Sequence, residues 1–191
     1  PFLKEILGKG EISFKDSDLD RLSSYFRELQ EYIALIEAID DAEPGDIILY
    51  DGSFDVFEPL RAVLFAVFAR AKAKGVGLLA VSKSSSLFWG DEASFPFVQH
   101  ASIAGSMFVP GVPWYLSLKN KNVDHCQSKW EGETYIVRFS ANNQLAFRVD
   151  VPAFLLGDIE SILSKLIAYS CSSECLGYPH ALFRAHRDIR I

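Results

Sequence analysis

The sequence predicts an α/β fold in which helices flank a mixed sheet, and three patterns support this. Apolar residues recur with helical spacing over residues 18–39. Two short apolar runs, 46–50 and 76–81, enclose a second helical segment, as buried parallel strands do. A later region alternates apolar and polar residues around 142–143. With 191 residues, 49% of them hydrophobic, the chain can bury one core, so we expect a single domain over residues 1–191.

The first predicted element is an amphipathic helix over residues 18–39. Its apolar side chains follow one another at steps of three and four, which places them on one face. They are Leu22, Phe26, Leu29, Ile33 and Ile36. Residues 16–18 offer Asp and Ser side chains for its N-cap, and the Pro-Gly pair at 44–45 ends the segment.

A strand, a helix and a second strand are predicted next. Residues 46–50 form an apolar run typical of a central strand buried on both faces, and Asp-Gly-Ser follows at 51–53. A helical pattern over 58–75 begins with Glu-Pro and closes at Gly75. Residues 76–81 form the second apolar run. Short connections between these elements predict a parallel strand pair joined by a right-handed crossover.

The middle of the chain is expected to be irregular. Residues 82–113 are rich in Ser and Phe and predict a functional or mobile loop region. A strand is predicted over 114–118. Residues 134–140 and 145–151 then alternate apolar and polar side chains, which predicts an antiparallel hairpin.

Two helices are predicted to follow the hairpin, the first capped by Asp158 and the second beginning at Pro179. On the second helix, His186 shares a face with Leu182 and Phe183, so from spacing alone we expect a hydrogen-bonded core histidine. The other polar residues of this helix share a different face. They are His180, Arg184 and Arg187.

Composition limits the possible functions. The net charge of −6 repels nucleic acids, so binding to DNA or RNA would need a local basic patch. Three cysteines do not describe a disulfide framework and favour a reducing, cytoplasmic location. No apolar run reaches the length of a membrane span. The chain begins with Pro rather than Met, so we expect an upstream segment in the full protein.

Polar residues stand where the two predicted parallel strands end. Asp51 follows the first strand and Lys83 follows the second. Because the carboxyl ends of parallel strands form the binding crevice of open sheets, the two side chains are candidates for one site. Each also has a plainer interpretation, since Asp51 can belong to a tight turn and Lys83 can be a solvated lysine.

Four segments in order resemble the NurA nucleases, namely residues 46–53, 81–84, 148–152 and 177–186. That family has a ribonuclease H-like fold, cleaves DNA with manganese and acts with the HerA translocase on DNA ends. The resemblance implies a 5'-3' exonuclease, a single-strand endonuclease, or both, in DNA end processing and repair. It further implies a homodimer with a HerA-type hexameric partner.

The resemblance implies a Mn²⁺ site, with Mg²⁺ as the other candidate ion. Asp51 matches the acidic ligand of the family's second Asp-Gly-Ser motif, and His186 matches its metal-binding histidine. A glutamate on the first helix is expected as a third ligand, either Glu31 or Glu28. We favour Glu31, which shares a stripe with Ala34 and would be half-buried, although both can be solvated. Mixed oxygen and nitrogen ligands favour Mn²⁺, because Mg²⁺ prefers oxygen.

The resemblance also implies roles in phosphate and DNA binding. Lys83, with Tyr178 as a hydrogen-bond donor, would hold the phosphate and stabilise charge in the transition state. Arg148, Arg184 and Arg187 would supply the local positive patch.

One departure from the family pattern leaves alternatives open. The family has an earlier Asp-Gly-Ser motif on its first strand, and no such motif precedes Asp51. Either that strand lies upstream or the ligand has been lost. In the second case the chain would be a non-catalytic relative that binds DNA or a protein partner. A different metal-dependent phosphohydrolase on the same scaffold is the third alternative.

Overall fold

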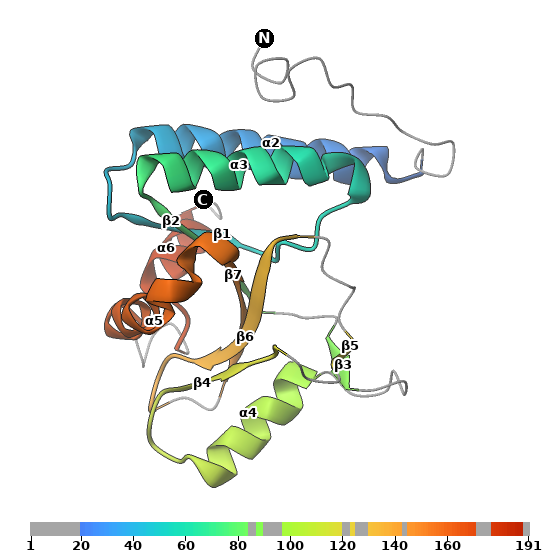
Figure 1. The fold of residues 1–191 in the computed structure, drawn as a ribbon. Coiled ribbons are helices and arrows are strands. Elements are labelled where there is room, and N and C mark those ends of the chain that lie inside the picture. Colours follow the sequence, from blue (N-terminus) through green and yellow to red (C-terminus); the bar gives the residue numbers. More distant parts are fainter. Residues whose placement is uncertain are drawn as a thin grey trace. The chain divides into compact units, whose positions relative to one another are not determined.

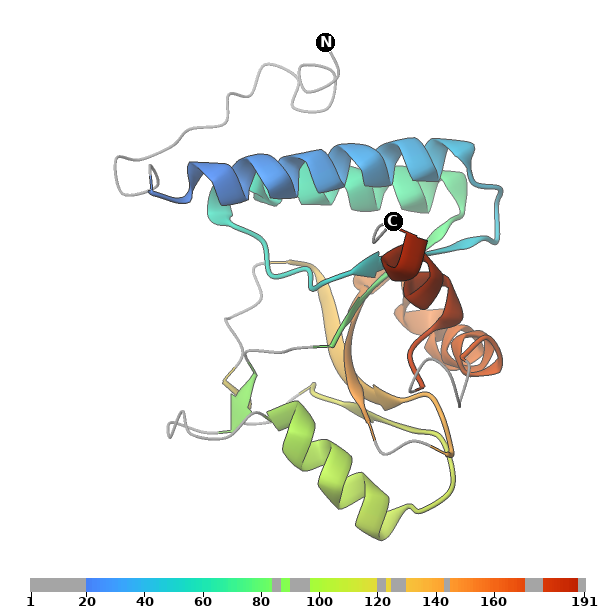
Figure 2. The same ribbon diagram turned by 180° about the vertical axis from the view of Figure 1, so that it is seen from behind.

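A computed structural model describes most of the chain, which forms a mixed five-stranded sheet with flanking helices (Figures 1 and 2). The α/β fold class predicted from the sequence is confirmed. The described residues are 20–83, 87–89, 97–119, 123–124, 130–142, 145–170 and 177–188. The chain clusters into two compact units, and the first contains its residues up to Ile48, Phe54–Leu78 and Trp130. The prediction of a single domain over 1–191 stays a prediction.

The first unit is built on two long helices, α2 (Leu22–Asp41) and α3 (Arg61–Lys74), which run side by side (Figure 1). The short 3-10 turn η2 (Glu58–Leu60) leads into α3. Arg70 on α3 donates to Asp40 on α2 over 2.7 Å, which holds the two helices in register. Gly75 ends α3 with φ 71°, a left-handed conformation that favours glycine. The N-cap expected at 16–18 lies outside the described residues.

Five strands form the main sheet, in the order β1, β2, β7, β6, β4. Their bounds are β1 Ile47–Asp51, β2 Gly77–Ser82, β4 Trp114–Ser117, β6 Gly132–Arg138 and β7 Phe147–Pro152. Gly77 N–H donates to Asp46 O, and Gly52 N–H donates to Val81 O. Because this pairing advances in the same direction along both strands, β1 and β2 are parallel. The predicted parallel pair is therefore confirmed.

The predicted hairpin is also confirmed, since β6 and β7 pair antiparallel from Gly132↔Pro152 to Val137↔Phe147. The alternation of a strand puts Phe147, Val149 and their partners on one face of this hairpin. Arg148 and Asp150 lie on the opposite face, where both are buried. The hairpin thus has an apolar face and a face that contains a charged pair.

The prediction that the first strand is buried on both faces is wrong. β1 stands at the end of the strand order, and its residues are half-buried or exposed. Of the two strands predicted to form the parallel pair, β2 is the one with a neighbour on each side, since it lies between β1 and β7, and all six of its residues are buried. An apolar run records residue type but not how many strands lie beside it.

The expectation of an irregular region over 82–113 is wrong as well. This stretch contains the strand β3 (Phe88–Trp89), which pairs with β5 (Val123–Asp124), and the helix α4 (Phe97–Phe108). Serine and glycine weaken the helical pattern of α4, but tertiary contacts stabilise it. Phe97 and Val98 pack in one apolar cluster with Ile136 of β6. Ser102 Oγ accepts the main-chain N–H of Ala146 over 2.9 Å, which ties the helix to the residue before β7.

The last part of the chain comprises the 3-10 segment η3 (Ala153–Asp158), α5 (Ile159–Ala168) and α6 (His180–Asp188). The two predicted helices are confirmed, although Asp158 makes no side-chain bond as the N-cap of α5. A bridge between Ser170 and Pro179 brings the start of α6 next to the end of α5. Among the helices that the structure describes, none combines the length and apolar character needed to cross a membrane.

The packing of α4 on β4 can be tested at Gly105. A Cβ at this position would overlap the indole ring of Trp114 on β4. Alanine normally stabilises the interior of a helix by about 1 kcal/mol relative to glycine. We expect Gly105→Ala instead to lower the free energy of unfolding by about 1–3 kcal/mol, because overpacking forces Trp114 to move. Urea denaturation measures this difference.

The matched control is Gly157→Ala in η3, where nothing lies within 4 Å of the added Cβ. This variant should be as stable as the wild type, within about 0.5 kcal/mol. A Gly105→Ala protein more stable than the wild type would show that α4 does not pack on β4 as described.

Candidate active site

The candidate site is centred on Asp51, the last residue of β1, whose side chain is 39% exposed. Directly after it, Gly52 N–H donates to the carbonyl oxygen of Val81 on β2 over 3.2 Å. A Cβ at Gly52 would lie 2.9 Å from the ring of Tyr50, so the turn is close-packed. The end of β1 is thus fixed against the end of β2, and the Asp51 carboxylate stands at an open edge of the sheet.

Tyr178 holds one oxygen of this carboxylate. Its hydroxyl donates to Asp51 Oδ1 over 2.8 Å and lies 3.3 Å from the Val81 carbonyl oxygen. The ring is 2% exposed and packs on Phe147 of β7, with ring centroids 5.2 Å apart. Burial raises the pKa of the Tyr178 phenol above its ordinary value. The hydrogen bond to Asp51 and the negative charge of Asp51 raise this pKa further. Tyr178 therefore keeps its proton and remains a donor.

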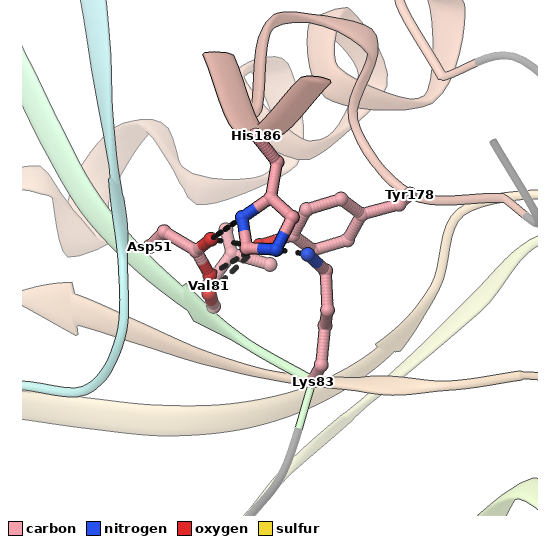
Figure 3. Close-up of polar contacts among 5 residues, drawn as sticks. All are labelled: Asp51, Val81, Lys83, Tyr178 and His186. Carbon is pink, nitrogen blue, oxygen red and sulfur yellow. Dashed lines mark hydrogen bonds and ion pairs between the residues drawn. The ribbon is translucent and has the colours of Figure 1, made fainter. Parts of the chain in front are cut away.

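Two nitrogen atoms face the other carboxylate oxygen, as Figure 3 shows. His186 Nδ1, from α6, lies 3.4 Å from Asp51 Oδ2. Lys83 Nζ lies 3.8 Å from the same oxygen and 4.1 Å from the centroid of the Tyr178 ring, where it makes a cation–π contact. The two oxygens of Asp51 therefore have different surroundings. Oδ1 accepts a hydrogen bond from a neutral hydroxyl, and Oδ2 faces the side-chain nitrogen atoms of Lys83 and His186.

The structure brings together four residues that the sequence singled out, Asp51, Lys83, Tyr178 and His186. Asp51 and Tyr178 are 127 positions apart in the chain, so their meeting is a product of the fold. The expectation of a core histidine at 186 is wrong. Its side chain is 50% exposed and faces Asp51.

The three arginines of the expected DNA-binding patch lie in different environments. Arg184 and Arg187 are exposed on α6, as a phosphate contact requires. Arg148 is 2% exposed, and its Nε lies 2.8 Å from Oδ1 of the fully buried Asp150. Thr134 donates its hydroxyl to the same oxygen. Since its guanidinium is enclosed in this pair, Arg148 does not lie on a surface that DNA could contact in this structure.

The two candidate glutamates lie on α2, in the first unit. Glu31 has a 40% exposed side chain, 3.7 Å from Arg27. Glu28 is more tightly held, because it accepts the Tyr32 hydroxyl over 2.6 Å and the main-chain N–H of Phe57. Burial raises the pKa of the Glu28 carboxyl, although these hydrogen bonds oppose the shift. The choice of Glu31 over Glu28 as a metal ligand stays a prediction.

The donor atoms of Asp51 and His186 fit a shared metal ion. Two ligand atoms at right angles, each about 2.1 Å from one ion, are about 3 Å apart. Oδ2 and Nδ1 are separated by 3.4 Å, and both side chains are partly exposed, so small movements would close the site. Within the described ranges, no group of three His, Cys, Asp or Glu residues is placed to hold an ion. All three cysteines lie outside these ranges.

Sequence reasoning missed two features of the site. The carbonyl oxygen of Val81 accepts the Gly52 N–H and lies beside the Tyr178 hydroxyl, but a main-chain acceptor has no signature in the sequence. Tyr178 was expected to donate to a phosphate, whereas here it donates to Asp51.

Comparison with known proteins found one structural likeness. No protein-family model matches the sequence, and no curated protein matches it. The crystal structure of the NurA nuclease from Sulfolobus solfataricus aligns with 98% of this chain and 52% of its own, with a TM-score of 0.43 and 17% sequence identity. This chain thus spans about half the length of that nuclease. At this level of similarity the match assigns no function.

The Tyr178 hydrogen bond can be tested by Tyr178→Phe. Loss of the hydroxyl leaves Asp51 Oδ1 without this donor, so we expect the free energy of unfolding to fall by about 1–2 kcal/mol. Urea denaturation measures it. The control is Tyr169→Phe, at a tyrosine that is 76% exposed, which should change stability by less than about 0.5 kcal/mol. Equal effects of the two substitutions would argue against the Asp51 bond.

The environment of Glu28 predicts a pH-dependent stability. Because the pKa of Glu28 is raised in the folded protein, the unfolded chain ionises first, and stability falls as the pH rises above the ordinary glutamate pKa of 4.5. Glu28→Gln removes this loss, so we expect its Tm to exceed that of the wild type by about 1–3 °C at pH 7. The difference should shrink towards pH 4.

Glu37→Gln is the control, because Glu37 is exposed on the same helix, whereas the charge of Glu31 itself helps to raise the Glu28 pKa. The Tm of this variant at pH 7 should match that of the wild type. If Glu28→Gln lowered the Tm at pH 7, the ionised carboxylate would be stabilising and the described burial would be incorrect.

Proposed function

We propose that this chain is a Mn²⁺-dependent deoxyribonuclease domain of the NurA kind, which hydrolyses phosphodiester bonds in DNA. The observation that carries the proposal is the meeting of Asp51 Oδ2 with His186 Nδ1, 3.4 Å apart, beside the ammonium group of Lys83. The ordered sequence segments that resemble NurA nucleases support it, because three of the four contribute all the residues of this cluster.

Each residue of the cluster has a chemical role in this proposal. Asp51 and His186 hold the metal through one oxygen and one nitrogen atom, a donor set that favours Mn²⁺ over Mg²⁺. When bound, the metal supplies polarisation of the scissile phosphate and a lower pKa for an attacking water. Tyr178 orients Asp51 through Oδ1. Lys83 binds the phosphate as a cation.

Two exposed arginines of α6 add positive charge to the helix that carries His186. Arg184 and Arg187 lie on a different face of α6 from His186, and Arg187 pairs with Asp188 over 3.5 Å. In this proposal they bind DNA outside the Asp51 cluster, as a local source of positive charge on a chain whose net charge is −6. Such local charge lets DNA phosphates approach a protein that would otherwise repel them.

The finer assignments of this proposal come from the sequence resemblance. They are 5'-3' exonuclease or single-strand endonuclease action in DNA end processing and repair, a ribonuclease H-like fold, a homodimer, and a HerA-type hexameric translocase as partner. The proposed cytoplasmic location comes from the small number of cysteines. A third metal ligand, Glu31 or Glu28, belongs to the same proposal.

One observation favours a second candidate function. In the part of the chain that the structure describes, Asp51 and His186 come together as potential ligands, but no third His, Cys, Asp or Glu joins them. A non-catalytic relative that binds DNA or a protein partner needs no more than this. The two candidates differ in whether the protein cleaves DNA.

The test is cleavage of end-labelled single- and double-stranded DNA with Mn²⁺, Mg²⁺ or EDTA, by this chain and by the longer protein. Asp51→Asn keeps the shape of the side chain and an acceptor for Tyr178 but removes the charge. We expect it and His186→Ala each to lose Mn²⁺-dependent cleavage by about 100-fold or more. His180→Ala, on the exposed face of the same helix, is the control and should cleave normally.

Full cleavage by a folded Asp51→Asn protein would contradict the assignment of the site. DNA binding by the longer protein without cleavage under any metal condition would instead favour the non-catalytic candidate.

A further inference from the structure

The two carboxylate oxygens of Asp51 have different contacts. Oδ1 is engaged by Tyr178, whose buried ring has little room to turn away. Oδ2 lies 3.8 Å from Lys83 Nζ and 3.4 Å from His186 Nδ1, and both distances are longer than those of normal hydrogen bonds. A metal ion would therefore bind Asp51 through Oδ2.

Lys83 stands at this same oxygen. Its ammonium group compensates the charge of Asp51 and lies over the face of the Tyr178 ring. A lysine nitrogen beside a ligand oxygen repels a divalent cation, so the ion pair and a metal compete for Oδ2. His186 does not compete in this way, because a neutral imidazole is itself a ligand.

Lys83 is free to exchange one anion for another. Its side chain is 43% exposed, and the 3.8 Å separation from Oδ2 is that of a loose ion pair rather than a tight hydrogen bond. Lysine also carries its charge on a flexible four-carbon chain, so the ammonium group can reach a nearby phosphate. Departure from Oδ2 costs little when a phosphate accepts the charge.

We propose that Lys83 is an exchangeable counter-ion, which occupies Asp51 Oδ2 when no metal is bound and transfers to a substrate phosphate when a metal takes its place. This inference rests on the proposed metal site. It assigns Lys83 two successive partners and makes it the residue that couples metal binding to phosphate binding.

The coupling has a thermodynamic consequence. A phosphate that attracts Lys83 removes the competitor from Oδ2, so phosphate binding tightens metal binding. By linkage, the metal tightens phosphate binding by the same factor. Without the lysine charge, metal binding becomes stronger in the absence of phosphate, and the part of the coupling that Lys83 carries is lost.

The experiment is titration of Mn²⁺, followed by the electron paramagnetic resonance signal of the free ion, with and without dTMP. This phosphate monoester has no internucleotide bond to cleave. Wild type, Lys83→Met and Asp51→Asn are compared. Lys119→Met is the matched control, because Lys119 is an exposed lysine that pairs with Glu133 over 2.6 Å.

We expect Lys83→Met to bind Mn²⁺ about three- to tenfold more tightly than the wild type without dTMP, as expected for loss of one partly exposed charge near the ligand. In the wild type, dTMP should tighten Mn²⁺ binding by a similar factor, and in Lys83→Met this effect should be clearly smaller, with only the direct attraction between the phosphate and the metal left. Lys119→Met should behave as the wild type. Thermal unfolding of each variant checks that it is folded.

Two outcomes overturn different statements. If Asp51→Asn weakens Mn²⁺ binding but Lys83→Met binds Mn²⁺ like the wild type, the counter-ion inference fails and the proposed metal site stands. If Asp51→Asn binds Mn²⁺ like the wild type, or no variant binds it, the metal site fails and the inference fails with it.

Discussion

The hydrogen bond from Tyr178 to Asp51 is the contact on which the site depends, because it joins the segment before α6 to the end of β1. α6 brings His186 to the sheet edge only if its first turn is anchored, and the buried ring of Tyr178 provides the anchor through Phe147. The same ring carries the cation–π contact with Lys83. One aromatic side chain thus orients the carboxylate and supports the lysine, and it fixes the start of the helix that bears the histidine.

Much of the fold was predictable because local patterns determine it. The spacing of apolar residues located α2 and α3, and the alternation around 142–143 located the β6–β7 hairpin. α4 was not predicted because two serines and a glycine interrupt its apolar pattern, and its stability comes from contacts with β6 and with Ala146. The position of β1 at the end of the strand order was not predicted, because residue type does not reveal the number of neighbouring strands.

The candidate site was predictable as a set of residues but not as an arrangement. Strand ends and a family resemblance identified Asp51, Lys83, Tyr178 and His186, yet nothing local indicates that Tyr178 donates to Asp51 across 127 positions. Spacing on α6 placed His186 beside Leu182 and suggested burial, whereas the helix presents its imidazole to a carboxylate at the surface. Alternation in β7 assigns Arg148 to the face opposite Phe147, but it cannot tell whether that face is covered.

The buried pair of Arg148 and Asp150 has a consequence for how the hairpin aligns. A slip of one residue between β6 and β7 would turn both charges towards the apolar face that holds Tyr178, and Asp150 would lose Thr134 as its neighbour across the strands. Moving an ion pair from bonded surroundings into an apolar layer is costly, so misaligned hairpins are strongly disfavoured. The charged pair therefore fixes the register of β7. Because Ser82 of β2 pairs with Arg148 of β7, this register also fixes the position of the last residue of β2, directly before Lys83.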